Sequence, residues 1–194
     1  MTLVLASSSP RRRELLTQLL FSSPLTQFEI VSPDIDETHF ENEATFDFVN
    51  RLAQQKAQAG FKLSQQFQNP VVLGSDTIVV INGMILGKPA SPENASEMLE
   101  QLSGKKHQVL TAVAVTNGEK MESSVIQTEV TFRKLSKACI NDYVKTGEPL
   151  DKAGSYGIQG LGGTFVSKIN GSYSAVVGLP MTQTYDLLKT FISI

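Results

Sequence analysis

The chain has 194 residues, 41% of them hydrophobic, which is enough for one substantial domain with a buried core. Its formal net charge of −2 gives no reason to expect a nucleic acid as partner, and its single cysteine excludes an intramolecular disulfide and a multi-cysteine zinc site. The chain has neither a run of about 18 apolar residues nor a signal-peptide pattern, so we expect a cytoplasmic protein without a transmembrane helix.

The first predicted elements are a strand at residues 2–6 and a helix at residues 10–20. Ser9 is a natural N-cap, and Pro10 fits the first helical turn, where its missing N–H costs no hydrogen bond. The serines from Ser7 to Ser9 and the arginines Arg11, Arg12 and Arg13 therefore gather at one helix N-terminus. Such an end favours anions, and guanidinium groups suit phosphate. The segment predicts a ligand with several phosphates, although plain capping beside exposed arginines explains it equally well.

A predicted strand at residues 28–31 is followed by an acidic stretch and then by a helix predicted over residues 45–67. The stretch contains Asp34, Asp36 and Glu37, whose hard oxygen atoms suit Mg²⁺, an ion usually held by one or two carboxylates plus substrate phosphates. Taken alone, the stretch is better explained as a solvated acidic loop. The helix carries Lys56, which alone is also an ordinary surface residue.

Residues 71–81 form a nearly continuous apolar run, rich in β-branched residues, which is typical of a central strand buried on both faces. Asp76 lies inside this run, and a buried carboxylate is costly unless it is paired, hydrogen-bonded or bound to metal. The alternative is that Asp76 ends a strand and caps a turn, but the apolar run continues beyond it. We therefore expect Asp76 to act as a general base on water, as a magnesium ligand, or as both.

The remaining chain alternates helices, strands and three Asn-Gly turns, which predicts an α/β protein with a mixed sheet and two lobes around a cleft. We expect the histidines His39 and His107 to lie at the surface. Lys88 lies between a glycine and a proline, which leaves its ammonium group available to neutralise phosphate. The predicted elements are strands at 84–86, 107–116, 119–133, 164–169 and 172–176, and helices that start at Ser91, at Ser136 and at Pro180.

The segment 147–163 carries six glycines in seventeen positions. This much glycine indicates backbone packed closely against a ligand or another strand. Gln159 lies between Ile158 and Gly160, and its amide can read the edge of a base. A flexible connector is the alternative, but the polar residues within the segment favour a binding loop.

Together these segments resemble the successive motifs of the Maf family of nucleoside triphosphate pyrophosphatases, in the family's order, from residue 3 to about 190. Each motif is weak alone, whereas the ordered set is specific. The motifs are Ser7-Ser8-Ser9-Pro10-Arg11-Arg12, Asp36-Glu37-Thr38, Arg51-Leu52-Ala53 with Lys56-Ala57, Gly74-Ser75-Asp76-Thr77, Gly87-Lys88-Pro89, Ser103-Gly104, Asp151-Lys152-Ala153-Gly154 with Tyr156-Gly157-Ile158-Gln159-Gly160, and Val177-Gly178-Leu179-Pro180.

The resemblance implies a single domain over residues 1–194 with an elongated, mixed, twisted sheet like that of the inosine triphosphatases, and commonly a homodimer. It implies hydrolysis of a nucleoside triphosphate to its monophosphate and pyrophosphate with Mg²⁺ or Mn²⁺. Asp76 matches the proton acceptor, and Asp36 and Glu37 match the acidic pair near the metal and water, where Asp76 is also expected as a ligand. The phosphate-binding set is matched by Ser7, Arg11, Arg12, Lys56 and Lys88.

Three positions resemble the specificity residues of the subgroup that acts on dTTP and UTP, namely Arg11, Thr77 and Gln159. The sister subgroup, which acts on 7-methyl-GTP, typically has an aromatic residue in place of Arg11. Two alternatives stay open: a non-catalytic nucleotide sensor that inhibits division, since the family has been linked to division arrest, and a nucleotidyltransferase, which would need an acceptor. A nucleic-acid-binding module fits the charge balance least well.

Overall fold

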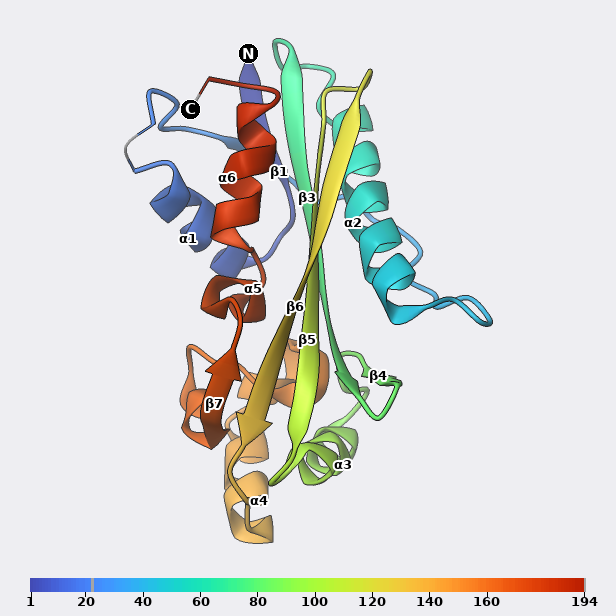
Figure 1. Cartoon of the computed structure of the whole chain (residues 1–194), viewed down its shortest axis with the longest axis vertical. Coiled ribbons are helices and arrows are strands. Elements are labelled where there is room, and N and C mark those ends of the chain that lie inside the picture. Colours follow the sequence, from blue (N-terminus) through green and yellow to red (C-terminus); the bar gives the residue numbers. More distant parts are fainter. Residues whose placement is uncertain (22, 194) are drawn as a thin grey trace. The chain divides into compact units, whose positions relative to one another are not determined.

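The computed structural model describes residues 1–21 and 23–193, and within them it contains a mixed seven-stranded sheet (Figure 1). The strands join in the order β2-β1-β3-β5-β6-β7, and β4 pairs with β3. β1 runs parallel to β2 and β3, whereas the pairs β3–β4 and β6–β7 are antiparallel. The strands are β1 (Thr2–Ala6), β2 (Glu29–Val31), β3 (Pro70–Ile81), β4 (Met84–Leu86), β5 (Lys106–Thr116), β6 (Met121–Phe132) and β7 (Val166–Asn170). The predicted α/β class is confirmed.

Helices flank the sheet, and serine side chains begin three of them as predicted. Ser9, Ser91 and Ser136 each accept a hydrogen bond from the backbone N–H three residues later. No helix among the described residues is long and apolar enough to cross a membrane. The helices are α1 (Pro10–Leu19), α2 (Thr45–Lys62), α3 (Pro92–Leu102), α4 (Lys137–Lys145), α5 (Tyr173–Val177) and α6 (Met181–Lys189), with short 3₁₀ turns η1 (Glu148–Asp151), η2 (Ala153–Ser155) and η3 (Leu161–Phe165).

The chain divides into two compact units that are interleaved along the sequence. Unit 1 comprises Met1–Asp76, Thr111–Ile126 and Gly178–Ile194, and unit 2 comprises Thr77–Leu110 and Gln127–Val177. The strands β3, β5 and β6 contribute residues to both units. Each unit is described separately below.

In unit 1, α2 packs directly on β3 at Gly74, and α1 and α6 lie on the other side of the strands (Figure 1). A Cβ atom added to Gly74 would lie 2.5 Å from the backbone oxygen of Ala53 and from the backbone nitrogen of Ala57. Only glycine therefore permits this close approach. Lys56 precedes Ala57 on the helix, and Asp76 lies two residues after Gly74, on the same side of the strand. The approach at Gly74 thus brings Lys56 to Asp76.

In unit 2, His107 is buried, which corrects the expectation that both histidines lie at the surface. His107 is 2% exposed, and its ring packs edge-on against Phe132 and Tyr156. Its Nε2 lies 2.9 Å from the hydroxyl of Tyr156. The physical reason is the two-residue period of β5, which places His107 on the same inward face as the buried Val109. His39, in contrast, is exposed as expected.

The structure also corrects two predicted elements, and in both cases a serine hydroxyl competes with the regular backbone pattern. The helix predicted to residue 67 ends at Lys62, because the hydroxyl of Ser64 binds the carbonyl oxygen of Gly60 at 2.7 Å. The strand predicted over residues 172–176 is instead the short helix α5. Its start is capped by Ser172, whose hydroxyl accepts a hydrogen bond from the backbone N–H of Ala175 at 3.2 Å.

Candidate active site

Asp76, Lys56 and Glu37 meet in unit 1. The ammonium nitrogen of Lys56 lies 2.6 Å from Oδ1 of Asp76 and 2.6 Å from Oε1 of Glu37. The side chains of Asp76 and Lys56 are 10% and 14% exposed, and that of Glu37 is 49% exposed. The buried carboxylate that the sequence singled out is therefore paired with a cation, as the cost of burying a lone charge requires.

The N-terminal end of α1 lies in the same unit and holds Ser7 and Arg12. The hydroxyl oxygen of Ser7 accepts hydrogen bonds from the backbone N–H of Ser9 at 3.2 Å and from Nη1 of Arg12 at 3.4 Å. Nε of Arg12 donates to the carbonyl oxygen of Gly178 at 2.9 Å. Burial lowers the pKa of Arg12, and the negative charges of Asp76 and Glu37 oppose this effect. Arg12 thus lies within electrostatic reach of the acidic residues.

Gly178 also links the strand that carries Asp76 to this loop. The hydroxyl of Ser75, which is fully buried, lies 2.8 Å from the carbonyl oxygen of Ala112 and 3.0 Å from that of Gly178. The carbonyl of Gly178 therefore contacts both Arg12 and the residue beside Asp76. Arg11, the other predicted phosphate ligand here, is half-buried at the start of α1.

The two acidic residues of the predicted pair have different surroundings. Glu37 contacts Lys56, whereas Oδ1 of Asp36 accepts hydrogen bonds from the backbone N–H of Thr38 at 2.9 Å and from its hydroxyl at 2.5 Å. The Thr38 hydroxyl and its backbone N–H lower the pKa of Asp36. Asp36 thus stabilises its own turn, and Glu37 is the member that joins the Lys56–Asp76 pair.

Arg51 holds the acidic loop against α2, a role that the sequence analysis did not assign. Its Nε and Nη2 donate to the two carboxylate oxygens of Glu43 at 2.6 and 2.7 Å, and Nη2 also donates to the carbonyl oxygen of Thr38 at 2.9 Å. Its guanidinium carbon lies 3.9 Å from the ring centre of Phe40. The hydrogen bond from Arg51 is the main cause that lowers the pKa of Glu43 to about 2. Arg51 therefore anchors the residue that follows Glu37.

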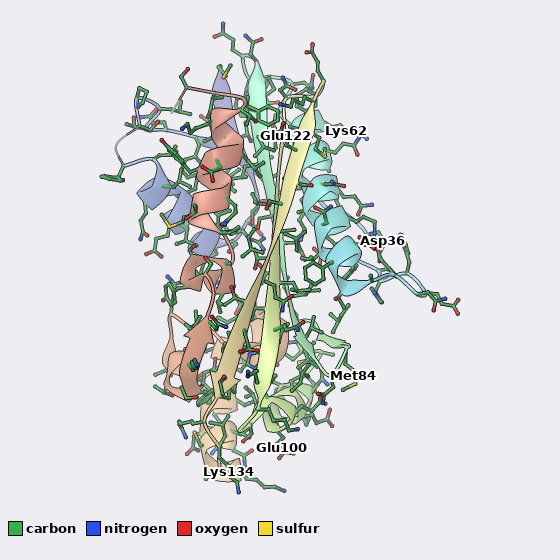
Figure 2. All side chains as sticks on the ribbon, in the orientation of Figure 1. Asp36, Lys62, Met84, Glu100, Glu122 and Lys134 are labelled. Atoms are coloured by element: carbon green, nitrogen blue, oxygen red, sulfur yellow. The ribbon has the colours of Figure 1, made fainter. Side chains whose placement is uncertain are left out.

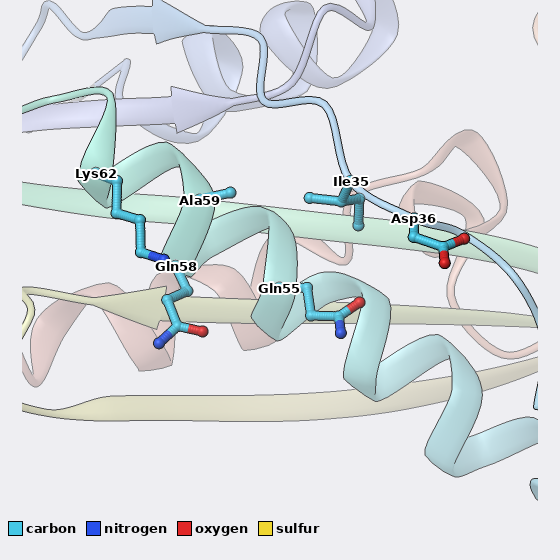
Figure 3. Close-up of a pocket in the computed structure, with 6 residues that line it drawn as sticks. All are labelled: Ile35, Asp36, Gln55, Gln58, Ala59 and Lys62. Atoms are coloured by element: carbon cyan, nitrogen blue, oxygen red, sulfur yellow. The ribbon is translucent and has the colours of Figure 1, made fainter.

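A groove of approximately 250 Å³ lies between α2 and the acidic loop (Figure 3). Two of its lining residues, Asp36 and Lys62, are labelled on the whole chain in Figure 2. Gln55, Gln58 and Lys62 project from one face of α2, and Ile35 and Asp36 approach from the loop (Figure 3). The lining includes neither Lys56 nor Asp76. Asp36 therefore lines this groove, whereas Glu37, the next residue, contacts Lys56.

The carboxylates of Glu37 and Asp76 suit a divalent cation, because one ammonium group already contacts both of them. Mg²⁺ is usually held by one or two protein carboxylates, with water and substrate phosphates completing its six oxygen ligands. Among the described residues, no group of three or more His, Cys, Asp or Glu side chains forms a complete metal cage. The two carboxylates therefore fit an ion whose remaining ligands are water and the phosphate oxygens of a substrate.

Three of the predicted residues belong to unit 2. Lys88 is exposed and follows Gly87, whose carbonyl oxygen accepts a hydrogen bond from the backbone N–H of Gly154 at 3.1 Å. Thr77 is half-buried on β3, directly after Asp76. Gln159 is exposed in the glycine-rich segment. The hydrogen bond at Gly154 joins the loop of Lys88 to that segment.

The glycines of this segment pack against protein side chains. A Cβ atom added to Gly160 would lie 2.5 Å from both carboxylate oxygens of Glu148, and one added to Gly162 would lie 2.7 Å from the hydroxyl of Tyr143. Glu148 and Tyr143 could not be singled out from the sequence, because their partners in the segment are backbone N–H groups. The only available signal was the high glycine content.

Comparison with known proteins supports the resemblance seen in the motifs. The family model described as Maf-like protein matches residues 2–191. The chain is 58% identical over 188 residues to the dTTP/UTP pyrophosphatase of Shewanella denitrificans, covering 97% of this chain and 95% of the relative. It is 56% identical over 190 residues to the dTTP/UTP pyrophosphatase of Salmonella typhimurium, covering 98% and 93%.

Among solved structures, a nucleoside-triphosphatase / dITP/XTP pyrophosphatase from Mycobacterium abscessus matches with a TM-score of 0.44 at 19% identity. That match covers 68% of this chain and 73% of the other, and it is too weak to establish a relationship. The family model and the curated relatives, in contrast, span nearly the whole chain. On this basis, the chain belongs to the Maf family.

Proposed function

We propose that this protein hydrolyses dTTP and UTP to the nucleoside monophosphate and pyrophosphate. The observation that carries the proposal is the buried carboxylate of Asp76, which lies 2.6 Å from the ammonium nitrogen of Lys56. Relatives that are 56–58% identical to this chain are named dTTP/UTP pyrophosphatases. Burying a carboxylate on a central strand is costly. Nucleotide binding alone does not require such a group, whereas a hydrolase uses one as the base that activates water.

Asp76 orients the attacking water and accepts its proton. As the water oxygen bonds to a phosphorus atom of the triphosphate, the proton passes to the carboxylate of Asp76 and the phosphoric anhydride bond breaks. The electron pair of that bond leaves on the departing phosphate oxygen. Lys56 keeps the carboxylate in one orientation, which limits the reorganisation that proton transfer requires.

The substrate carries roughly four negative charges on its triphosphate, and the chain supplies cations to offset them. Arg12 and Ser7 act together, because the guanidinium already binds the serine hydroxyl and the carbonyl of Gly178. We assign Arg11, Lys56 and Lys88 to the same phosphate-binding set. Preorganised donors of this kind usually provide the largest part of the rate acceleration.

Glu37 and Asp76 would hold the divalent cation, with Asp36 in the adjoining turn. Mg²⁺ or Mn²⁺ would neutralise charge on the triphosphate oxygens when it is bound. For the base, we assign specificity to Arg11, Thr77 and Gln159. The amide of Gln159 offers one donor and one acceptor direction, which matches the edge shared by thymine and uracil.

The deciding experiment measures pyrophosphate release from a panel of nucleoside triphosphates, with Mg²⁺, with Mn²⁺ and with a chelator. Metal-dependent cleavage of dTTP and UTP in preference to purine triphosphates is the expected result. Preference for 7-methyl-GTP would keep the reaction and overturn the specificity assignment. Nucleotide binding without turnover of any substrate would overturn the proposal in favour of a sensor.

A further inference from the structure

Two side chains of unit 2 hold the two ends of a short turn that has Gln159 at its centre. At the first end, the backbone N–H of Gly157 donates to the hydroxyl oxygen of Tyr143 at 3.1 Å. At the second end, the backbone N–H groups of Leu161 and Gly162 donate to Oε2 and Oε1 of Glu148 at 2.9 and 3.0 Å. Only residues 158–160 lie between these anchor points.

The two anchoring side chains are also bonded to each other. The hydroxyl of Tyr143 donates to Oε1 of Glu148 at 2.9 Å, so one carboxylate accepts three hydrogen bonds. Burial raises the pKa of Glu148, but the N–H groups of Gly162 and Leu161, the Tyr143 hydroxyl and the charge of Lys152 outweigh it and lower the pKa overall. The group that accepts these bonds is therefore the charged carboxylate, and charge-assisted bonds are about twice as strong as neutral ones.

The glycines within the turn leave room for this anchor. An added Cβ at Gly160 would lie 2.5 Å from both oxygens of Glu148, and one at Gly157 would lie 2.7 Å from Cε of Lys152. The turn is closed by the backbone hydrogen bond from Gly160 N to Gly157 O, at 3.2 Å. Gln159 is exposed at this turn while the backbone on both sides of it is tied down. The glycines thus make a rigid turn rather than a flexible connector.

We propose that Glu148 is a positioning residue for base recognition, which acts by fixing the turn that presents Gln159. This inference rests on the proposed function, in which Gln159 reads the pyrimidine. A backbone turn held in place before binding loses no further freedom on binding, and it presents the residue at its centre from one fixed position. Glu148 therefore determines substrate selectivity without touching the substrate.

The test replaces Glu148 with glutamine, which keeps the size of the side chain and removes its charge. The amide oxygen can take the place of Oε1, but the amide nitrogen then faces the N–H of Leu161, donor against donor. We expect kcat/KM for dTTP to fall about tenfold, and the ratio of kcat/KM for dTTP over dCTP to fall several-fold. Tyr143→Phe, which removes the other anchor, should change the ratio in the same direction.

Glu129→Gln is the matched control, because Glu129 lies in the same unit, is half-buried like Glu148 and pairs with the exposed Lys106. It should leave both the rate and the ratio unchanged. A second readout, which does not depend on activity, is hydrogen exchange at the amides of Leu161 and Gly162. Their protection should be lost in Glu148→Gln and kept in Glu129→Gln.

The outcomes separate this inference from the proposed function. If the wild-type protein does not cleave dTTP, the proposed function itself fails. If the wild type is active but Glu148→Gln lowers kcat/KM equally for every nucleotide, Glu148 is merely structural and the inference is overturned. Unchanged amide protection in Glu148→Gln would also overturn it, because the carboxylate would then not hold the turn.

Discussion

The ammonium nitrogen of Lys56 lies 2.6 Å from Oδ1 of Asp76, and this ion pair crosses from α2 to the central strand β3. Both side chains are largely buried, so the ion pair offsets part of the cost of removing each charge from water. The pair exists because α2 and β3 touch at Gly74, where a Cβ atom would collide with the helix backbone. A glycine two residues before the acid therefore determines what the acid can bind.

Asp76→Asn should lose at least about 100-fold in kcat while keeping its fold, because an amide cannot accept the proton of the attacking water. The size of the side chain is unchanged, and Lys56 keeps Glu37 as a partner. Pyrophosphate release and a thermal melt together measure the two effects. Asp142→Asn, which removes a surface carboxylate 3.2 Å from Lys145, is the control. Near-normal turnover of Asp76→Asn would remove Asp76 from the base role.

Arg51→Lys should raise the metal concentration that gives half-maximal activity roughly tenfold, with little change in kcat at saturating metal. Lysine cannot make the two parallel bonds to Glu43 or stack on Phe40, so the loop that positions Glu37 is held less tightly. A titration of activity against Mg²⁺ checks this. Arg133→Lys in unit 2 serves as the control, because Arg133 also binds a backbone carbonyl oxygen, that of Thr164 at 2.8 Å, and lies 5.6 Å from the ring centre of Phe165. A lower kcat with an unchanged metal requirement would contradict the role of Arg51.

Gly154→Ala should lower the free energy of unfolding by about 3 kcal/mol, because two separate costs add at this position. The residue has φ of +67°, and a Cβ atom would lie 2.8 Å from a methyl carbon of Val79. Gly147 also has a positive φ, of +76°, but nothing lies within 4 Å of an added Cβ atom. Gly147→Ala should therefore cost only about 1 kcal/mol. Urea denaturation measures the free energy of unfolding of both variants. Equal losses in Gly154→Ala and Gly147→Ala would contradict the contribution of the contact with Val79.

The protein should lose stability as the pH falls from about 6.5 to about 4. Burial lowers the pKa of His107 from 6.5 to about 4, so in this window the unfolded chain binds a proton that the folded protein does not. The neutral, buried His107 therefore contributes about 3 kcal/mol to the free energy of unfolding above pH 6.5, and this contribution is lost by pH 4. Denaturation at a series of pH values measures it.

His107→Gln should flatten this part of the pH dependence, because glutamine does not titrate and its amide can still bond to the hydroxyl of Tyr156. His39→Gln, at an exposed position, is the matched control. If His107→Gln keeps the full loss of stability between pH 6.5 and 4, the effect does not come from His107.

Most of the helices and strands could be predicted because the sequence patterns that specify them involve residues close together in the chain. Serine caps, a proline in the first turn and the Asn-Gly pair act over a few residues, and Asn82 and Gly83 adopt the positive φ values, 51° and 80°, that a tight hairpin needs. The predictions that were wrong concern segments in which a serine hydroxyl can replace a regular backbone hydrogen bond. Ser64 and Ser172 both divert backbone hydrogen bonds, and their choice depends on the surrounding structure.

The candidate site was predicted less evenly. Asp76 could be singled out because an acid within an apolar strand is costly wherever the chain folds. Its pairing with Lys56, however, depends on where α2 crosses β3. The different partners of Asp36 and Glu37 depend on how the loop lies on that helix. Glu148 had no signal of its own, because it binds backbone N–H groups that every residue except proline possesses.

By itself, therefore, the sequence determined the class of the fold, the starts of its helices, the buried acid and the resemblance to a family. These depend on apolar periodicity and on interactions between residues close in the sequence, which do not require contacts with distant residues. Only the tertiary structure decided which charges meet, whether His107 is buried, and that Glu148 holds the turn of Gln159. Such contacts join segments far apart in the chain, and their energies depend on burial and distance, which arise only once the chain has packed.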